Sequence, residues 1–180
     1  DGYLIPNDYG AAAWRRSSHG MYQNHIRGGD VSLDQLEALR DKPAYSLVRH
    51  GRGQGGAQHR SRPIALAVES HIYAERAGAP RKFEDGVPTL SVFVQWMGSH
   101  LYEWRTGDYR GTPNMGKSRF APFMFGLTSY SLIEFYEWES ERGADPNAYW
   151  PISLPIDYGQ GVSDDPQTIS WPTIPSALAD

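Results

Sequence analysis

Residues 122–142 read PFMFGLTSYSLIEFYEWESER and decide the fold of this chain. Large apolar side chains recur in this stretch at the three- to four-residue spacing of a helix, and they do so on more than one side. The two rows are Phe123, Leu127 and Tyr130, and Phe125, Leu132 and Tyr136. A helix that is apolar on more than one face belongs inside an assembly of helices. The stretch therefore predicts a helix that is covered from several directions.

Two further segments, 63–77 and 89–106, have the same helical spacing of apolar residues. Pro63 suits the first turn of a helix, and Gly78 suits the position just after its end. Each of the three segments carries an arginine shortly before a closing glycine, and these glycines lie 29 and 36 residues apart. A period of that size is typical of repeated helix-turn-helix units. The sequence therefore predicts a mainly α fold of repeated α-hairpins, with a helical core over 63–143.

The N-terminal part, residues 1–62, is expected to be rich in loops. Residues 1–32 lack sustained periodicity, so they predict ordered loop with at most one short helix. Ser32 and Gln35 form a capping-box pattern that would start a short helix over 33–41, and Pro43 would end it. A short extended run, Ala44–Val48, and a Gly- and Arg-rich loop over 50–62 would follow.

The last part, residues 144–180, is expected to be irregular and to pack on the helices. It contains six prolines and five aspartates without any lysine or arginine. Tyr149, Trp150 and Trp171 would anchor it. The whole chain fits one domain.

Composition narrows the classes of function. The formal net charge of −4 and the lack of a strongly basic segment make nucleic acid an unlikely partner. No run of apolar residues is long enough to cross a membrane. The chain has no cysteine, which excludes disulfides and thiolate metal sites. The histidines lack the spacing of a metal site, so we expect no metal and no cofactor.

The helices resemble those of α/α-toroid proteins over about 63–147. The resemblance is carried by Ala121–Leu127 (APFMFGL), by Leu132–Glu137 (LIEFYE), and by the Arg105–Tyr109 turn (RTGDY). Many such proteins are glycoside hydrolases or polysaccharide lyases, so the resemblance implies a carbohydrate-active, extracytoplasmic or secreted protein. A complete toroid has about twice as many helices, which implies that this chain belongs to a larger protein or self-associates.

The densest group of candidate site residues lies in the 49–62 segment, where glycines alternate with arginines and histidines. Arginine forks bind carboxylate or phosphate, and the following helix N-terminus favours an anion. An acidic polysaccharide would suit this site. The expected substrate-binding residues are Arg49, Arg52, Arg60 and Arg62, together with Trp96 as a sugar-stacking ring. The expected catalytic residues of a lyase are His50 or His59 as base and Tyr130 as acid.

Three alternatives remain open from the sequence. A hydrolase would instead need paired carboxylates, for which the candidates are Glu69, Glu103, Glu134 and Asp157. The chain could also be a non-catalytic module whose apolar helices complete the core of a partner. Finally, Leu47–Gly51 (LVRHG) resembles the strand-end Arg-His-Gly of histidine phosphatases, which would make His50 the residue that is phosphorylated.

Overall fold

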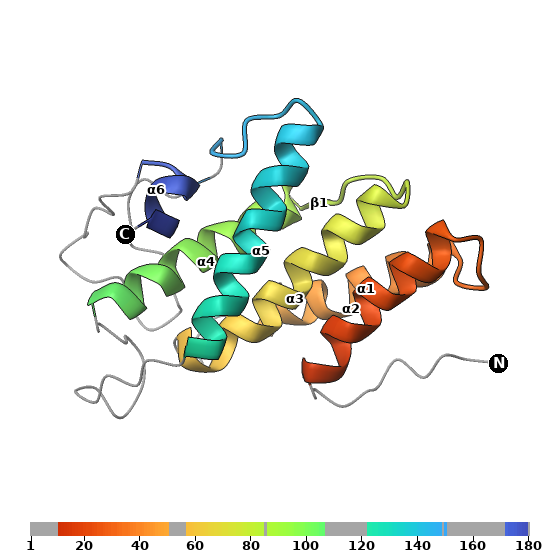
Figure 1. Ribbon diagram of the computed structural model, residues 1–180, viewed down its shortest axis with the longest axis horizontal. Coiled ribbons are helices and arrows are strands. Elements are labelled where there is room, and N and C mark those ends of the chain that lie inside the picture. The colour runs from red at the N-terminus through yellow and green to blue at the C-terminus, as the bar shows by residue number, and fades with distance from the viewer. Residues whose placement is uncertain are drawn as a thin grey trace.

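The computed structural model describes residues 11–50, 57–84, 86–106, 122–148, 150 and 172–179. Within them the chain is mainly α-helical, as the sequence predicts (Figure 1). The helices are α1 (Ala11–Ile26), α2 (Leu33–His50), α3 (Ala57–Arg76), α4 (Thr89–Thr106), α5 (Pro122–Glu141) and α6 (Ile174–Ala179). Two short strands, β1 (Phe83–Glu84) and β2 (Val87–Pro88), pair antiparallel between α3 and α4.

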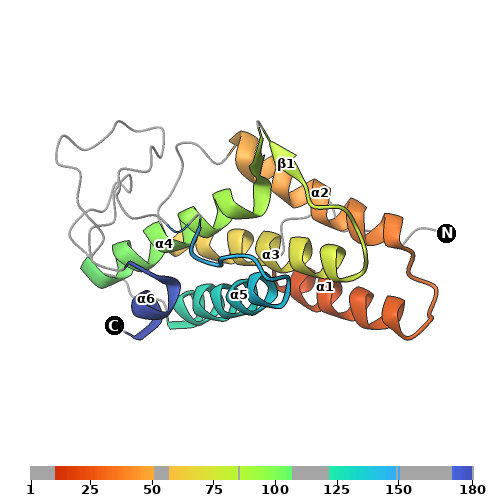
Figure 2. The same ribbon diagram turned by 90° about the horizontal axis from the view of Figure 1, so that it is seen from above.

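Helix α3 is the centre of the molecule, because it packs against α1, α2, α4 and α5. Figures 1 and 2 show that α1, α3 and α5 run in one direction, whereas α2 and α4 run in the opposite direction. The chain therefore forms two α-hairpins, α1–α2 and α3–α4, followed by α5 against the other side of α3. This arrangement confirms the prediction of a helical-hairpin core.

The closing glycines of α3 and α5 act as the sequence predicts. Gly78 and Gly143 have positive φ values of 103° and 71°, a conformation that only glycine adopts cheaply. The next amide bonds back to the helix, Ala79 N to Ala74 O and Ala144 N to Glu139 O, both at 2.9 Å. These are Schellman turns. The third predicted turn, at Gly107, lies outside the described residues.

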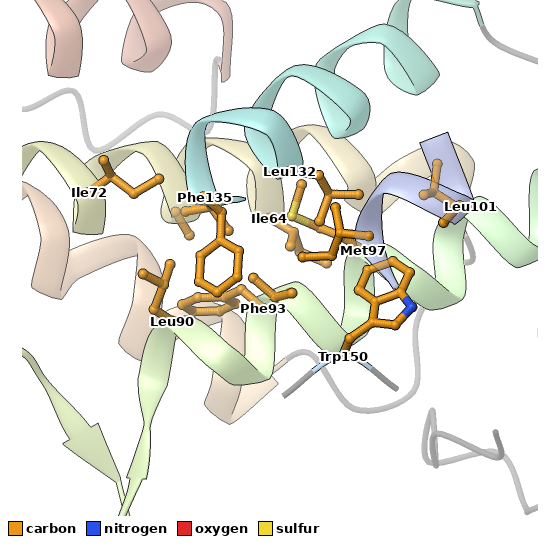
Figure 3. Packing of buried hydrophobic residues seen from close by; sticks show 14 residues of the cluster. Ile64, Ile72, Leu90, Phe93, Met97, Leu101, Leu132, Phe135 and Trp150 are labelled. Carbon is orange, nitrogen blue, oxygen red and sulfur yellow. The ribbon is translucent and has the colours of Figure 1, made fainter. Parts of the chain in front are cut away.

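The main hydrophobic core lies between α3, α4 and α5 (Figure 3). In Figure 3, Phe135 of α5 points toward Phe93 and Leu90 of α4, and Trp150 lies beside Met97. All five side chains are at most 4% exposed.

Of the two apolar rows predicted for α5, the row Phe125, Leu132 and Tyr136 lies against this core, and its burial stabilises this part of the chain. In the other row Phe123 is 65% and Tyr130 40% exposed, so the prediction that α5 is covered from several directions is wrong for that side.

The N-terminal part is more helical than predicted. Residues 11–26 form α1, and α2 continues to His50 without stopping at Pro43. Three predictions are therefore wrong where the structure describes these residues: the loop over 1–32, the stop at Pro43 and the extended run Ala44–Val48. A proline inside a helix costs about 3 kcal/mol, and the packing of α2 along α3 offsets that cost. The capping box at Ser32 is confirmed, because Ser32 N donates to Gln35 Oε1 at 2.8 Å.

Helix α3 begins earlier than predicted, at Ala57 rather than at Pro63. The predicted 50–62 loop is wrong for residues 57–62, which are already helical, while residues 51–56 lie outside the described residues. The reason is the same as at Pro43: local stop and start signals are weaker than the packing of a long helix against its neighbours.

The described parts of the C-terminal tail, residues 144–148, 150 and 172–179, include a short helix, α6, that the sequence did not indicate and that packs on the other helices. Ile174 of α6 is fully buried in the main core. Its amide donates to Asn147 Oδ1 at 2.9 Å, and Thr173 Oγ1 accepts from Ser176 N at 3.2 Å as a cap. Trp150 is an anchor at 4% exposure; Tyr149 and Trp171 lie outside the described residues.

The C-terminal ends of α3 and α5 are joined by buried ion pairs. The guanidinium of Arg81 donates to Glu75 Oε2 at 3.0 Å and to both carboxylate oxygens of Glu139. Arg142 Nη1 adds a bond to Glu75 at 3.3 Å, and Trp138 Nε1 adds another at 3.0 Å. Burial by itself lowers the pKa of Arg81, but the two carboxylates raise it above its ordinary value. These charged groups are paired with one another, which indicates that they stabilise the contact between the ends of α3 and α5.

Candidate functional site

A group of polar and aromatic side chains gathers around Tyr73, on the part of α3 that lies between α1 and α5. Tyr73 is 4% exposed. Its ring stacks on Tyr22 of α1 with centroids 5.3 Å apart, and its hydroxyl lies 3.0 Å from His19 Nδ1. A buried phenol usually has a hydrogen-bond partner, and here α1 supplies it. Tyr73 therefore joins α1 to the central helix.

Glu69 lies one helical turn before Tyr73 and is 1% exposed. Ser131 of α5 donates its hydroxyl to Glu69 Oε1 at 3.1 Å. The same hydroxyl lies 3.4 Å from Ala65 O. Burial of a carboxylate is costly without such partners. The α3–α5 contact thus holds one carboxylate inside the helical layer.

A second carboxylate, Glu134, lies on α5 nearer to the surface. Tyr130 donates its hydroxyl to Glu134 Oε1 at 3.0 Å, and Arg76 Nη1 donates to Oε2 at 3.2 Å. Both oxygens of this carboxylate are therefore oriented. The Tyr130 side chain is 40% exposed, so an aromatic ring beside an oriented carboxylate faces the solvent.

Electrostatics link these groups to one another. The pKa of Tyr73 is raised above its ordinary value, first by burial and then by the charges of Glu134 and Glu69 and by Tyr130. Tyr73 therefore stays a neutral phenol that can donate a hydrogen bond. We call Glu69, Tyr73, Tyr130 and Glu134 the Tyr73 cluster. Two carboxylates with a neutral phenol and an exposed ring can in principle transfer protons to and from a sugar.

The buried His71 does not fit such a role. It is 1% exposed, its ring centroid lies 5.7 Å from that of Phe93, and its Nε2 makes no hydrogen bond within the described part of the chain. Its pKa is lowered to about 3, chiefly by burial and then by the charges of Arg40 and Lys82. It is therefore a neutral core residue near pH 7.

The described members of the predicted Arg/His group lie on helices. Arg49 and His50 are the last two residues of α2. Their chain neighbour Arg52 lies outside the described residues. His59, Arg60 and Arg62 are in the first two turns of α3. The side chains of residues 42–63 lie outside the described part of the structure, so the predicted roles of this group stay predictions.

The structure describes the side chains of two other predicted site residues, Trp96 and Tyr130. Trp96 is half-buried on α4, packs against the main core and makes an edge contact with Phe93 at 6.4 Å between centroids. Tyr130 belongs to the Tyr73 cluster. Of the predicted carboxylates, the structure brings Glu69 and Glu134 to the same part of α3 and α5, whereas the Glu103 side chain and Asp157 lie outside the described part.

Tyr73, His19 and Arg76 are not among the site residues that the sequence predicts. The sequence did contain one signal for Tyr73. Glu69 and Tyr73 are four residues apart, which places them on one side of a helix. Nothing in the sequence pairs α1 with that side. The missed partners depend on which helices become neighbours, so only tertiary packing identifies them.

Two classes of site receive no support from the described residues. No group of three or more His, Asp or Glu side chains there is arranged to hold a metal ion. No helix in that part of the chain is both long and apolar enough to cross a membrane. No family model, curated protein or solved structure matches this chain, and the resemblance to α/α toroids stays a prediction.

Proposed function

We propose that the chain is a carbohydrate-active domain and that the Tyr73 cluster is the part that acts on a polysaccharide. The observation that carries the proposal is the placement of two carboxylates on the α3–α5 contact, Glu69 bonded to Ser131 and Glu134 bonded to Tyr130, whose charges both act on the buried phenol of Tyr73. Glycoside hydrolysis needs two carboxyl groups near one bond. The exposed ring of Tyr130 offers an apolar face of the kind on which sugars stack.

Each member of the cluster has a role in this proposal. Glu134 is held by Tyr130 and Arg76 and acts at the surface as acid or base. Glu69, which is buried and bonded to Ser131, supplies the second carboxylate. The hydrolase version is better supported than the lyase version, because the cation nearest to Glu134, Arg76, is already paired with Glu134 and Glu141. A lyase needs a free cation for the uronate carboxylate.

The Arg/His group at the start of α3 extends the proposed site toward an acidic polysaccharide. Arg62 precedes Glu69 by seven residues, which is two helical turns or about 10 Å along α3. A polymer could reach both regions. An extracytoplasmic or secreted location goes with such a substrate and is part of the same proposal.

The first test is incubation of the full chain with a panel of neutral and acidic polysaccharides. New reducing ends would report hydrolysis, a rise in ultraviolet absorbance would report elimination, and calorimetry would report binding without turnover. We expect new reducing ends with at least one substrate. Silence in all three readouts would overturn the proposal.

The second test uses a matched pair of variants on α5. Glu134→Gln keeps the size of the side chain and removes the charge, so we expect a loss of about 10²–10⁴-fold in kcat/KM. Glu141→Gln is the control, because Glu141 also pairs with Arg76 but is 57% exposed and lies outside the cluster. Equal losses in the two variants would contradict the assigned role of Glu134.

A second candidate, the non-catalytic assembly module, is favoured by the outer face of α5, which carries large exposed apolar side chains. The histidine-phosphatase alternative has lost its support, because His50 ends an α-helix and not a strand.

A further inference from the structure

Two buried residues near the start of α4 each have a polar side-chain atom that makes no hydrogen bond within the described part of the chain. The atoms are Nε2 of His71 on α3 and Oγ1 of Thr89, which is the first residue of α4. The two residues are only 1% and 2% exposed. A buried polar atom without a partner is unfavourable, so a ligand that bonds to both atoms would stabilise the folded chain.

Both atoms belong to the contact between α3 and the first turns of α4. The ring centroid of His71 lies 5.7 Å from that of Phe93. Thr89 precedes Phe93 by four residues, so these two side chains share one side of α4. The side of α4 that His71 contacts is therefore also the side that carries Thr89. The two unpartnered atoms thus lie at one end of the same helix contact.

Charged side chains from α2 and from the turn before β1 border this end of the contact. Arg40 Nε donates to Asp41 Oδ1 at 2.8 Å, and Arg40 Nη1 donates to Pro80 O at 3.0 Å. Lys82 Nζ lies 3.0 Å from the same oxygen of Asp41. The backbone of Lys82 is held beside α4, because Thr89 N donates to Lys82 O at 3.0 Å. The turn therefore joins α2 to the start of α4.

The charge around the two atoms is positive among the described groups. Arg40 and Lys82 share the carboxylate of Asp41, whereas Arg81 is neutralised by two carboxylates of its own. The pKa of His71 is lowered first by burial and then by the charges of Arg40 and Lys82, which outweigh the opposite effect of Asp41. A water molecule would give the two atoms a partner but would leave this charge uncompensated. An anion does both.

We propose that a small monovalent anion such as chloride binds between His71, Thr89 and Lys82. The Thr89 hydroxyl and the Nε2–H tautomer of the neutral imidazole donate to it, Lys82 supplies the charge, and the N-terminal end of α4 favours an anion. Residues that are 1–2% exposed enclose it, so only a small ion fits. The side chains of Lys82 and Asp41 are 34% and 44% exposed and mark the side from which the ion enters. This site is separate from the sugar activity proposed above.

The first test compares thermal unfolding of the full chain in sodium chloride and in sodium gluconate at equal ionic strength. Gluconate has the same charge but is too large for an enclosed site, and general screening by salt is the same in both. We expect chloride to raise the melting temperature progressively with its concentration, as a ligand of the folded state does, and gluconate to raise it much less. Equal melting temperatures in the two salts at every concentration would overturn the proposal.

A matched pair of variants locates the site. Thr128 on α5 is also buried, and its Oγ1 also makes no hydrogen bond within the described residues, but it lies away from the turn before β1. Thr89→Val and Thr128→Val each keep the size of the side chain and remove only a hydroxyl. Thr89→Val should weaken chloride binding about tenfold, since it removes a hydrogen bond to a charged ligand, whereas Thr128→Val should not. The same chloride dependence in both variants would contradict the site.

The imidazole of His71 gives a direct readout by nuclear magnetic resonance. At pH 7, chloride should shift the ring signals of His71 with the same concentration dependence as the melting temperature, and gluconate should leave them in place. The signals are assigned by their loss in His71→Leu. If the ring signals of His71 do not respond to chloride, the proposal is wrong, even where chloride raises the melting temperature.

Discussion

At the scale of single residues, the interior of this protein contains several ionisable groups that differ in whether they are paired. Glu69 accepts a hydrogen bond from Ser131, and Glu75 forms an ion pair with Arg81. His71 has an aromatic neighbour, Phe93, and two nearby cations. The two carboxylates thus have polar partners, whereas the buried His71 is stable in the folded chain only as the neutral imidazole.

This difference predicts acid sensitivity from His71. Its pKa is about 3 in the folded chain and about 6.5 in the unfolded chain. Between these values the unfolded chain binds more protons, so stability is complete above about pH 6.5 and falls as the pH decreases toward 3. The slope is on the order of 1 kcal/mol per pH unit.

Denaturant unfolding at pH 7 and pH 5 checks the prediction. The wild type should lose stability between the two values, and His71→Leu should lose less, since it has no group to protonate there. Identical losses in the two proteins would show that other groups cause the acid sensitivity.

At the scale of elements, the helices begin and end by local chemistry but are positioned by contacts between their ends. The glycine turns after α3 and α5 and the capping box before α2 act within a few residues. The ion pairs of Arg81 and Arg142 instead join residues that are 58 and 67 positions apart in sequence. They fix the C-terminal ends of α3 and α5 beside each other.

The ion pairs differ in burial, which predicts unequal effects of mutation. The side chain of Arg81 is 13% exposed and lies between two carboxylates that are each 4% exposed. Arg81→Met leaves these charges buried and should lower the free energy of unfolding by about 3–5 kcal/mol. Arg142 is 35% exposed, so Arg142→Met should cost about 1 kcal/mol or less. Chemical denaturation of both variants gives the comparison, and equal costs would contradict it.

At the scale of the whole molecule, α3 belongs to two hydrophobic clusters. The main core joins α3 to α4, α5 and α6, while a smaller cluster with Leu36 of α2, Val31 and Ala74 of α3 joins it to the first hairpin. Both hydrophobic clusters therefore include residues of the same helix, α3. A helix that is buried by neighbours on all sides cannot keep its place when one of them leaves, so we expect the described helices to unfold together.

Leu36→Ala tests this coupling. Leu36 is 2% exposed, and its truncation should cost about 2–5 kcal/mol. Although the change is in the smaller cluster, the unfolding midpoint should shift equally by far-ultraviolet circular dichroism and by near-ultraviolet signals from tryptophans such as Trp150 in the main core. A shift in one signal without the other would show that the first hairpin unfolds independently.

Local patterns by themselves determined the helices α4 and α5, the capping box at Ser32 and the glycine turns at Gly78 and Gly143, since spacing, hydrogen bonding and φ preference act within one or two turns. They did not determine α1, the passage of α2 through Pro43 or the early start of α3, because burial against a neighbouring helix outweighs a weak local signal. Tertiary structure alone decided that Glu134 of α5 and His19 of α1 lie near Tyr73. Contacts between residues more than 50 positions apart depend on which helices become neighbours, and no short-range pattern records that choice.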